Sequence, residues 1–588
     1  MAIDPAALEQ RMAWLEVDSA VEKPEEVVAL FHLSRDFGAK NLPLQGIKCL
    51  EAVVGGNFLP QIEAEARANL AAMLMKYTNN LREAKAHLEH ALRTVENLPV
   101  ALSFVCRVIS LLGTCLGQLN SAVQQKQVLL KGLNLVRQDR LQFEGATERE
   151  KIGWYVAFHA SLVQVLVSEG DKVSALATAQ SARKELAERA GLAVRLQINL
   201  TVLQLLLLSQ DYEGARECID VCTSLGERCA TKESVELGSY LCLLRALYEL
   251  RIGNVGDLQD SLAQAKNLVL KMKSGEVEAK LLLPDFLHSL LLLLESVCLR
   301  MSGHYSEERD VSEEARKKIE NEWILVNSAH TNETFKSTYI LLKYLVLESQ
   351  IISALTQCKI QEAASLITAA IELIDAYPQT LGGVESSVHL MIGSVNMLCG
   401  DFDHAEDHLK LALASSRDQY QASLAKLQLC FCSLENESIT SAEAEESFQR
   451  FSVSFEKRDR AYPAHLLCQV ALALMRSDIG GAKAMVREAL QSAHANGDHQ
   501  VIVLCLVEFG KITALEGDTT QTKESIDAAK SLAANLSHLP SLIQALAFSD
   551  QILKKETILS PILYKWGKKV MNARVKDKIQ NWRTQAVH

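Results

Sequence analysis

Two histidines four residues apart, His404 and His408, are the pair in this chain that most resembles a metal site. Side chains at positions i and i+4 lie on one face of a helix, and two histidines placed in this way can bind a zinc ion. The spacing is that of H-E-x-x-H, but Ala405 follows the first histidine where that motif needs its glutamate. We therefore expect a solvent-exposed helix face here and no bound metal.

Cysteine pairs and phosphate-binding motifs give no stronger signal. Cys430 and Cys432, and likewise Cys218 and Cys222, lack the second, correctly spaced pair that a structural zinc site requires. The chain has no G-x-x-x-x-G-K-[ST], G-x-G-x-x-G or G-x-S-x-G segment. Its 14 cysteines are scattered through helical patterns, which is typical of a reducing compartment. The sequence thus predicts no catalytic residue, no cofactor and no metal, and a protein that is not an enzyme.

A repeat of small residues organises the chain instead. In residues 389–414, Gly393 is followed by Gly400-Asp401 and then by Ala405 and Ala412. These offsets match the tetratricopeptide repeat (TPR), in which small residues on both helices of a hairpin flank a Gly-Asp turn. Small side chains are needed because the two helices pack about 8–10 Å apart. We expect a helical hairpin here, with its alanines buried between the helices.

The same frame extends along most of the sequence, with copies every ~40–55 residues where a standard TPR repeats every 34. The longer spacing predicts longer helices or irregular links between them. The alanines that we expect to be buried between paired helices are Ala84, Ala175, Ala215, Ala363, Ala405 and Ala482.

Composition agrees with a helical repeat protein. Among 588 residues only 10 are proline and 5% are aromatic, and no alternating strand pattern appears. Length alone suggests several globular domains, but a solenoid escapes this limit because each repeat contacts only its neighbours. The predicted fold is all-α, a TPR-like α-solenoid of about eleven helical hairpins. We assign residues 1–23 to an N-terminal segment, 24–540 to the repeat array, and 541–588 to basic C-terminal capping helices.

Two segments could suggest a membrane or secretion. Residues 281–299 are strongly apolar, but Pro284, Asp285, His288 and Glu295 interrupt them, so we expect a buried helix and no membrane span. The first twelve residues lack a basic region followed by an apolar core, which argues against a signal peptide.

The C-terminal tail is basic, whereas the whole chain has a net charge of −11. Residues 565–583 read as a basic helix with Trp566, Val570 and Trp582 as apolar residues. The favoured interpretation is a cap whose tryptophans cover the last repeat. A contact with nucleic acid or an acidic partner, or a nuclear targeting signal, is the alternative.

TPR arrays bind peptides through the concave surface that the first helix of each hairpin lines. On the outward side of two such helices the sequence offers polar and apolar residues that do not form a carboxylate clamp. They suit an extended or helical ligand held largely by apolar contacts. The predicted partner-binding residues are Asn69, Met73, Lys76, Leu390, Ser394 and Met397. Alternatively, Met73 and Met397 only fill gaps between neighbouring helices.

Residues 47–92 resemble the opening of a known family, the TPR subunit of the cohesin loader (Mau, or cohesin loading factor, family). A C-L-x-A-V element leads through a proline to I-E-A, then to an Asn-containing hairpin and A-x-x-H-L-E-x-A. The matching stretches are Ile47 to Val53, Pro60 to Arg67, Asn79-Asn80 and Ala84 to Ala91. Residues 232–268, 283–308 and 393–412 resemble later parts of the family, so the resemblance covers most of 25–540.

The resemblance implies a nuclear, non-enzymatic protein associated with chromatin. Members of the family wrap their superhelix around the N-terminal part of the HEAT-repeat loader subunit, of the Nipped-B/adherin type. Together the two load cohesin rings onto chromatin for sister-chromatid cohesion. The alternative is a TPR scaffold subunit of another large assembly, such as the anaphase-promoting complex or a proteasome-lid-like particle. A lid subunit should end in a winged helix, and residues 540–588 show no strand pair.

Overall fold

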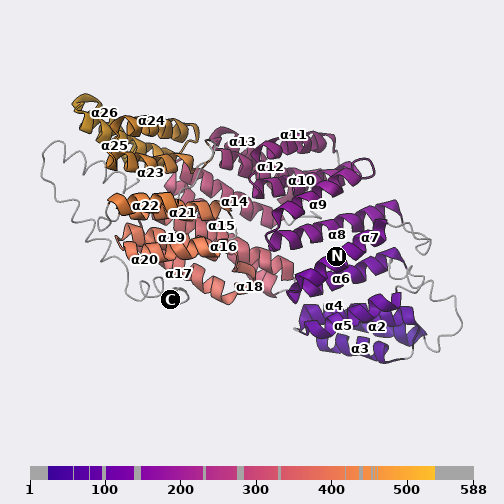
Figure 1. The fold of residues 1–588 in the computed structure, drawn as a ribbon. Helices are drawn as coiled ribbons and strands as arrows, with labels where there is room; N and C mark the ends of the chain where they lie inside the picture. The colour runs from indigo at the N-terminus through magenta and orange to yellow at the C-terminus, as the bar shows by residue number, and fades with distance from the viewer. Residues whose placement is uncertain are drawn as a thin grey trace. The chain divides into compact units, whose positions relative to one another are not determined.

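The computed structural model describes residues 24–536, except for 41, 57, 79, 96–100, 138–146, 230–232, 275–283, 329–332, 417–418, 436–440, 452–454, 456, 458 and 460. Helices make up most of this part of the chain, and the described residues contain no strand (Figure 1). The predicted all-α fold is confirmed. The predicted segments 1–23 and 541–588 lie outside the described residues.

The described chain forms two compact units, which divide between Asp211 and Tyr212. The first unit contains α2 (Pro24–Ala39), α3 (Pro43–Gly55), α4 (Pro60–Tyr77), α5 (Leu81–Val95), α6 (Leu102–Gln118), α7 (Ala122–Arg137), α8 (Glu148–Ser168), α9 (Lys172–Glu185) and α10 (Leu192–Leu208). Four hairpins follow one another there: α2/α3, α4/α5, α6/α7 and α8/α9.

The second unit begins with α11 (Tyr212–Arg228). It continues with α12 (Glu233–Ile252), α13 (Val255–Lys273), α14 (Pro284–Met301), α15 (Tyr305–Ser328), α16 (Glu333–Thr356), α17 (Ile360–Ala376), the short α18 (Pro378–Leu381), α19 (Glu385–Leu398), α20 (Phe402–Ser415), α21 (Gln419–Glu435), α22 (Ser441–Phe451), α23 (Tyr462–Met475), α24 (Ile479–Ala495), α25 (His499–Glu516) and α26 (Thr519–Asn535). Its seven hairpins are α12/α13, α14/α15, α16/α17, α19/α20, α21/α22, α23/α24 and α25/α26. With the four hairpins of the first unit, the described residues match the predicted number of about eleven.

The turns between paired helices repeat one local design. The residue before the second helix is often an aspartate whose carboxylate accepts a hydrogen bond from a backbone N–H of the first turn, as Asp171, Asp478 and Asp518 do. Such a cap satisfies a donor that the helix itself leaves unpaired. The residue before the aspartate adopts a positive φ, which Gly517 (φ 81°) does without steric cost. The Gly-Asp pair of the repeat therefore ends one helix and starts the next.

The small residues that the sequence predicts to be buried are indeed buried. All six named alanines are completely buried. The glycines on the first helices are equally crowded: a Cβ on Gly393 would lie 2.7 Å from a methyl group of Leu409, and one on Gly510 would lie 2.7 Å from a methyl group of Ile526. Both pairs are sixteen residues apart in sequence. One geometry of close helix approach thus recurs in different hairpins.

Distant hairpins also meet within the second unit. Gln500 at the start of α25 donates a hydrogen bond to the hydroxyl of Tyr305, the first residue of α15. Leu536, directly after α26, packs against Gly303 in the turn before α15. Burial raises the pKa of Tyr305. The end of the described chain is therefore held at the N-terminal end of α15.

The apolar segment singled out from the sequence is largely α14, with Leu287, Leu291 and Leu294 buried. Within the described residues, α16 is the one helix long and apolar enough to cross a membrane. Half of its apolar window is buried, and it packs between α15 and α17. Both segments are core helices of the second unit.

Candidate functional site

A row of exposed apolar side chains lies on the first helices of several hairpins in the second unit. Leu398, Met475 and Leu515 stand in the last turns of α19, α23 and α25 and are 40%, 43% and 63% exposed. Leu398 and Leu515 each follow a packing glycine, Gly393 or Gly510, by five residues. Five residues turn a helix by about 140°, so these side chains lie away from the paired second helix. We call this row the A-helix face.

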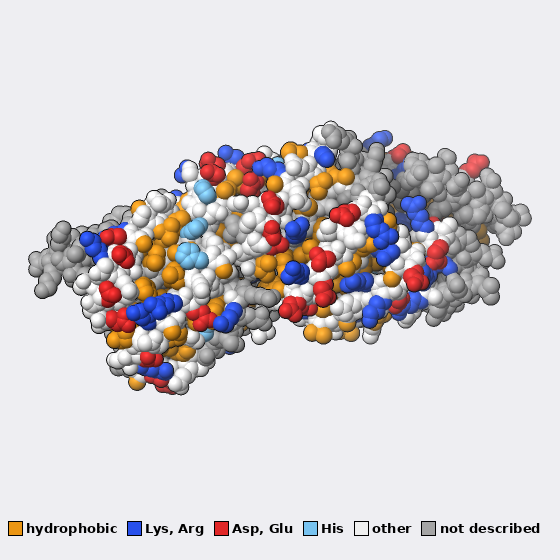
Figure 2. Space-filling model, turned by 90° about the horizontal axis from the view of Figure 1, so that it is seen from above, with side chains coloured by type: hydrophobic (Ala, Val, Ile, Leu, Met, Phe, Trp, Pro, Cys, Tyr) orange, Lys and Arg blue, Asp and Glu red, His pale blue; other side chains and the backbone are white. Residues whose placement is uncertain are grey.

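Further apolar side chains border the A-helix face. Met397 and Leu474 precede Leu398 and Met475 and are partly buried against neighbouring helices. Ile352 on α16 is 37% exposed. On the side of the molecule seen in Figure 2, exposed hydrophobic side chains lie among basic and acidic side chains. An exposed apolar row is suited to hold a partner segment by its hydrophobic side chains.

Three of the predicted partner-binding residues lie between neighbouring first helices of the second unit. Leu390 is buried in a cluster with Ala425 of α21. The hydroxyl of Ser394 accepts a hydrogen bond of 3.2 Å from Gln428 of α21, and it donates one to the carbonyl of Leu390. Met397 packs against the same cluster. These residues connect α19 to α21 on the flank of the A-helix face, and their role in partner binding stays a prediction.

The other three predicted residues belong to α4 in the first unit. Asn69 accepts a hydrogen bond from Arg107 of α6, and the sulfur of Met73 accepts one of 3.3 Å from Ser34 of α2. Lys76 is exposed, with its ammonium 5.0 Å from the centre of the Tyr77 ring. Asn69 and Met73 thus connect successive hairpins, while Lys76 is the one available to a partner. Their role also stays a prediction.

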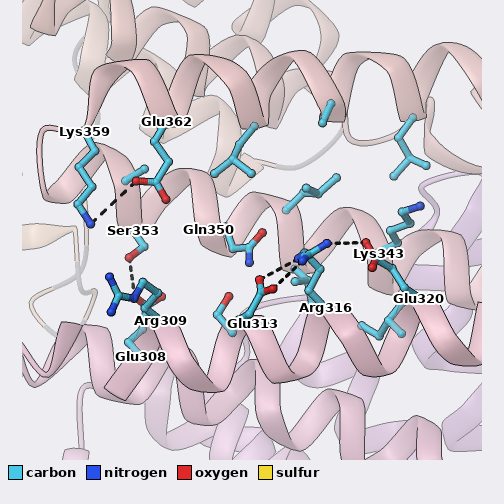
Figure 3. Close-up of a pocket in the computed structure, with 18 of the residues that line it drawn as sticks. Glu308, Arg309, Glu313, Arg316, Glu320, Lys343, Gln350, Ser353, Lys359 and Glu362 are labelled. Carbon is cyan, nitrogen blue, oxygen red and sulfur yellow. Dashed lines mark hydrogen bonds and ion pairs between the residues drawn. The ribbon is translucent and has the colours of Figure 1, made fainter. Parts of the chain in front are cut away.

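A groove in the second unit lies between α15 and α17, with α16 at its base, and encloses about 760 Å³ (Figure 3). Its apolar lining comes from Ile319, Val346, Leu347, Leu366 and Leu373. Small side chains on α16 and α17, among them Ala354, Ala369 and Ala376, leave the space open. The sequence reasoning missed this groove because α15 and α17 are more than thirty residues apart and their spacing depends on α16.

Charged side chains line the rim of the groove. Arg316 binds Glu313 at 2.6 Å and Glu320 at 2.8 Å along α15, as Figure 3 shows. The hydrogen bond that Arg316 donates to Glu313 raises the pKa of Arg316 above its usual range. Six carboxylates and four basic side chains line the groove, so carboxylates are in excess.

A buried polar cluster closes the end of the groove near the start of α15. Glu308 is 1% exposed and accepts a hydrogen bond from Ser353 of α16. The guanidinium of Arg300 on α14 lies 3.6 Å from the same carboxylate and donates to the carbonyl and hydroxyl of Ser349. A buried carboxylate is tolerated only with such partners. The cluster joins α14, α15 and α16, at a position where other hairpins use small apolar residues.

The two histidines of the possible metal site, His404 and His408, differ in exposure. His404 is half exposed and lies 2.8 Å from a carboxylate oxygen of Asp401. His408 is completely buried, and its Nδ1 lies 3.0 Å from Nδ1 of His389 on α19. The expected solvent-exposed face is therefore wrong for His408, because its position on α20 faces the paired helix α19. Among the described residues no three His, Cys, Asp or Glu side chains gather in a way that could hold a metal.

Cysteines serve packing at equivalent places in the repeat. The thiol of Cys115 on α6 donates to the backbone carbonyl of Leu81 at the start of α5, at 3.3 Å. The thiol of Cys432 on α21 donates in the same way to Phe402 at the start of α20, at 3.6 Å. Burial raises the pKa of Cys432 to about 12, so this thiol is protonated at neutral pH. Cys430 and Cys432 therefore lie in the packed interior of the second unit.

Paired helices, small residues at their crossings and an apolar A-helix face define this chain as a helical-repeat interaction protein of the TPR type. The family model of the cohesin loading factor matches residues 44–547. The chain belongs to the cohesin loading factor family.

Two curated relatives show how far the similarity extends. The sister chromatid cohesion protein SCC4 of Arabidopsis thaliana is 32% identical over 140 residues, which cover 23% of this chain and 18% of the relative. The chain therefore spans less than a fifth of that relative in this match. The MAU2 chromatid cohesion factor homolog of Drosophila willistoni is 21% identical over 520 residues, covering 83% of this chain and 74% of the relative.

Solved structures include one similar chain described as Scc4 in complex with Scc2n. It has a TM-score of 0.49 and 12% identity, and the match covers 87% of this chain and 99% of that one.

Proposed function

We propose that this protein is a non-enzymatic scaffold subunit of a cohesin loading complex in the nucleus. In this proposal it binds the N-terminal segment of the HEAT-repeat loader subunit, of the Nipped-B/adherin type. The complex promotes cohesin loading on chromatin for sister-chromatid cohesion. The observation that carries the proposal is membership of the cohesin loading factor family over residues 44–547. The names of the relatives, which are cohesion proteins, support it.

The A-helix face supports the mode of binding. Leu398, Met475 and Leu515 occupy one position of the repeat in three of the last four hairpins, so an extended segment that follows the array meets several apolar contacts. A segment that becomes ordered only on binding needs many such contacts to offset the conformational entropy that it loses. A long array supplies them, and a scaffold of this kind needs no catalytic residue of its own. Family membership also favours this role over a subunit of the anaphase-promoting complex or of a proteasome-lid-like particle.

The test is co-purification of the full chain with the N-terminal segment of the HEAT-repeat subunit. Leu398→Lys combined with Met475→Lys should weaken the complex, because two ammonium groups replace apolar contacts. Leu270→Lys is the matched control, since Leu270 is also exposed, at 54%, but lies on the second helix α13. Equal binding by the double variant and the control would exclude the A-helix face as the binding surface.

The cellular part of the proposal has its own measurement. Depletion of the protein should lower the amount of cohesin bound to chromatin, and the wild-type chain should restore it. Unchanged chromatin-bound cohesin, together with recovery of only ubiquitin-ligase or proteasome subunits in a pull-down, would favour the alternative assemblies.

A further inference from the structure

The groove between α15 and α17 has the chemistry of a site for a basic amphipathic segment. Leu347 of α16 and Leu366 and Leu373 of α17 offer apolar contacts in the groove. Apart from the buried Glu308, five carboxylates and four basic side chains line the groove, and Arg316 is already neutralised by Glu313 and Glu320. A segment with an apolar stripe and several lysines therefore finds complementary partners in both parts of the groove.

The chain itself contains such a segment. Residues 565–583 carry seven Lys or Arg and a single acidic residue, Asp577. Read as a helix, Met571, Val575, Ile579 and Trp582 recur every three or four residues and form an apolar stripe. Seven of the fifteen remaining positions are basic. The segment thus matches the groove in hydrophobic pattern and in charge.

The described chain also ends beside the groove. Leu536 packs against Gly303, and Gln500 holds Tyr305 at the start of α15. Glu308 and Arg309, which line the near end of the groove, follow Gly303 by five and six residues, a rise of about 9 Å along a helix. Residues 537–564 separate Leu536 from the basic segment, and an extended chain of that length reaches ~90 Å. A tethered segment so close to its site has an effective concentration in roughly the millimolar range.

We propose that the groove between α15 and α17 is the docking site of the chain's own basic C-terminal segment, residues 565–583. Docking places the apolar stripe on the leucines that line the groove and the lysines against the carboxylates of its rim. The tail then covers the side of the second unit formed by α15, α16 and α17. This inference is independent of the proposed role in cohesin loading.

The test uses the full chain with a photo-crosslinking amino acid in place of Leu366, on the α17 side of the groove. Irradiation followed by mass spectrometry should give crosslinks to peptides from 565–583. The same probe at the exposed Ala528 on α26 tests whether the tail instead packs as a cap on the last repeat. A probe at the exposed Leu270 on α13 is the surface control. Crosslinks to the tail from Ala528 but not from Leu366 would overturn the proposal in favour of a cap.

Charge reversal supplies the second readout. Lys568→Glu, Lys569→Glu and Lys576→Glu together should lower the yield of the Leu366 crosslink about tenfold at low salt, since three favourable charge contacts become repulsive. Thermal unfolding of the same variant checks that the array remains folded. An undiminished crosslink would refute the charge complementarity. The crosslinked tail could belong to the same chain or to a second copy. Mixing isotopically labelled and unlabelled chains distinguishes the two. If every crosslink joined different chains, docking within one chain would be wrong.

Discussion

Leu409 of α20 occupies the space that a side chain on Gly393 of α19 would need. A Cβ built on Gly393 lies 2.7 Å from one methyl group of Leu409 and 2.8 Å from its Cγ. Leu409 and the adjacent Ala405 are completely buried, so the leucine has little room to retreat. This contact fixes how closely the two helices of the hairpin approach.

Gly393→Ala should therefore destabilise the second unit. Overpacking of the helix crossing should cost about 1–3 kcal/mol, and the higher helix propensity of alanine should offset about 1 kcal/mol of this cost. Gly153 on α8 is the matched control, because a Cβ there meets no atom within 4 Å. Gly153→Ala should instead stabilise the chain slightly. Chemical denaturation measures both changes. Equal effects of the two substitutions would contradict the close contact between Gly393 and Leu409.

Ala405→Leu tests the same crossing from the second helix. Ala405 is completely buried between α19 and α20, so the larger side chain should cost roughly 1–3 kcal/mol of stability. Ala414→Leu on the same helix should be nearly neutral because Ala414 is exposed. Thermal unfolding of the two variants gives the comparison, and a tolerated leucine at 405 would show that the hairpin can widen.

The buried ion pair between Arg300 and Glu308 predicts a large effect of removing one charge. Glu308→Ala should cost about 3–5 kcal/mol, since it leaves the guanidinium of Arg300 without its carboxylate in the interior. Glu307→Ala, which removes an exposed carboxylate from the same helical turn, should have little effect. Denaturant unfolding distinguishes the two variants. A mild loss for both would mean that water reaches the cluster.

His159 predicts a pH dependence of the first unit. Burial, with the nearby charge of Arg137, lowers its pKa from 6.5 to about 4, although Glu185 acts in the opposite direction. The folded state therefore keeps His159 neutral between pH 6.5 and 4, while the unfolded state takes up a proton in this range. Its contribution to stability is complete above pH 6.5 and is lost as the pH falls towards 4.

The measurement is the free energy of unfolding between pH 7 and 4 for the wild type and for His159→Leu. The variant should lose less stability over this range, because the leucine cannot take up a proton in the unfolded state. Replacing the exposed His304 with leucine provides the control, and it should leave the profile of the first unit unchanged. Parallel profiles for wild type and His159→Leu would contradict a buried, neutral His159.

The sequence by itself determined the helical hairpins and where they touch. Small residues at fixed offsets and Gly-Asp turns are local features, since a crossing of two connected helices depends on residues about twenty positions apart. The buried alanines, the approximate number of hairpins and the family could be predicted for this reason. The positions of Gly393 and Gly510 also predict that Leu398 and Leu515, five residues further along, face away from the paired helix.

Only the tertiary structure decided how the hairpins stack and which surfaces remain. The division after Asp211, the groove between α15 and α17, and the contact of Gln500 with Tyr305 depend on residues from thirty to nearly two hundred positions apart. His408 was read as exposed because its spacing from His404 was considered without the facing helix, where His389 buries it. Exposure depends on the neighbouring helix as well as on the residue's own helix, and the sequence pattern of one helix does not contain that neighbour.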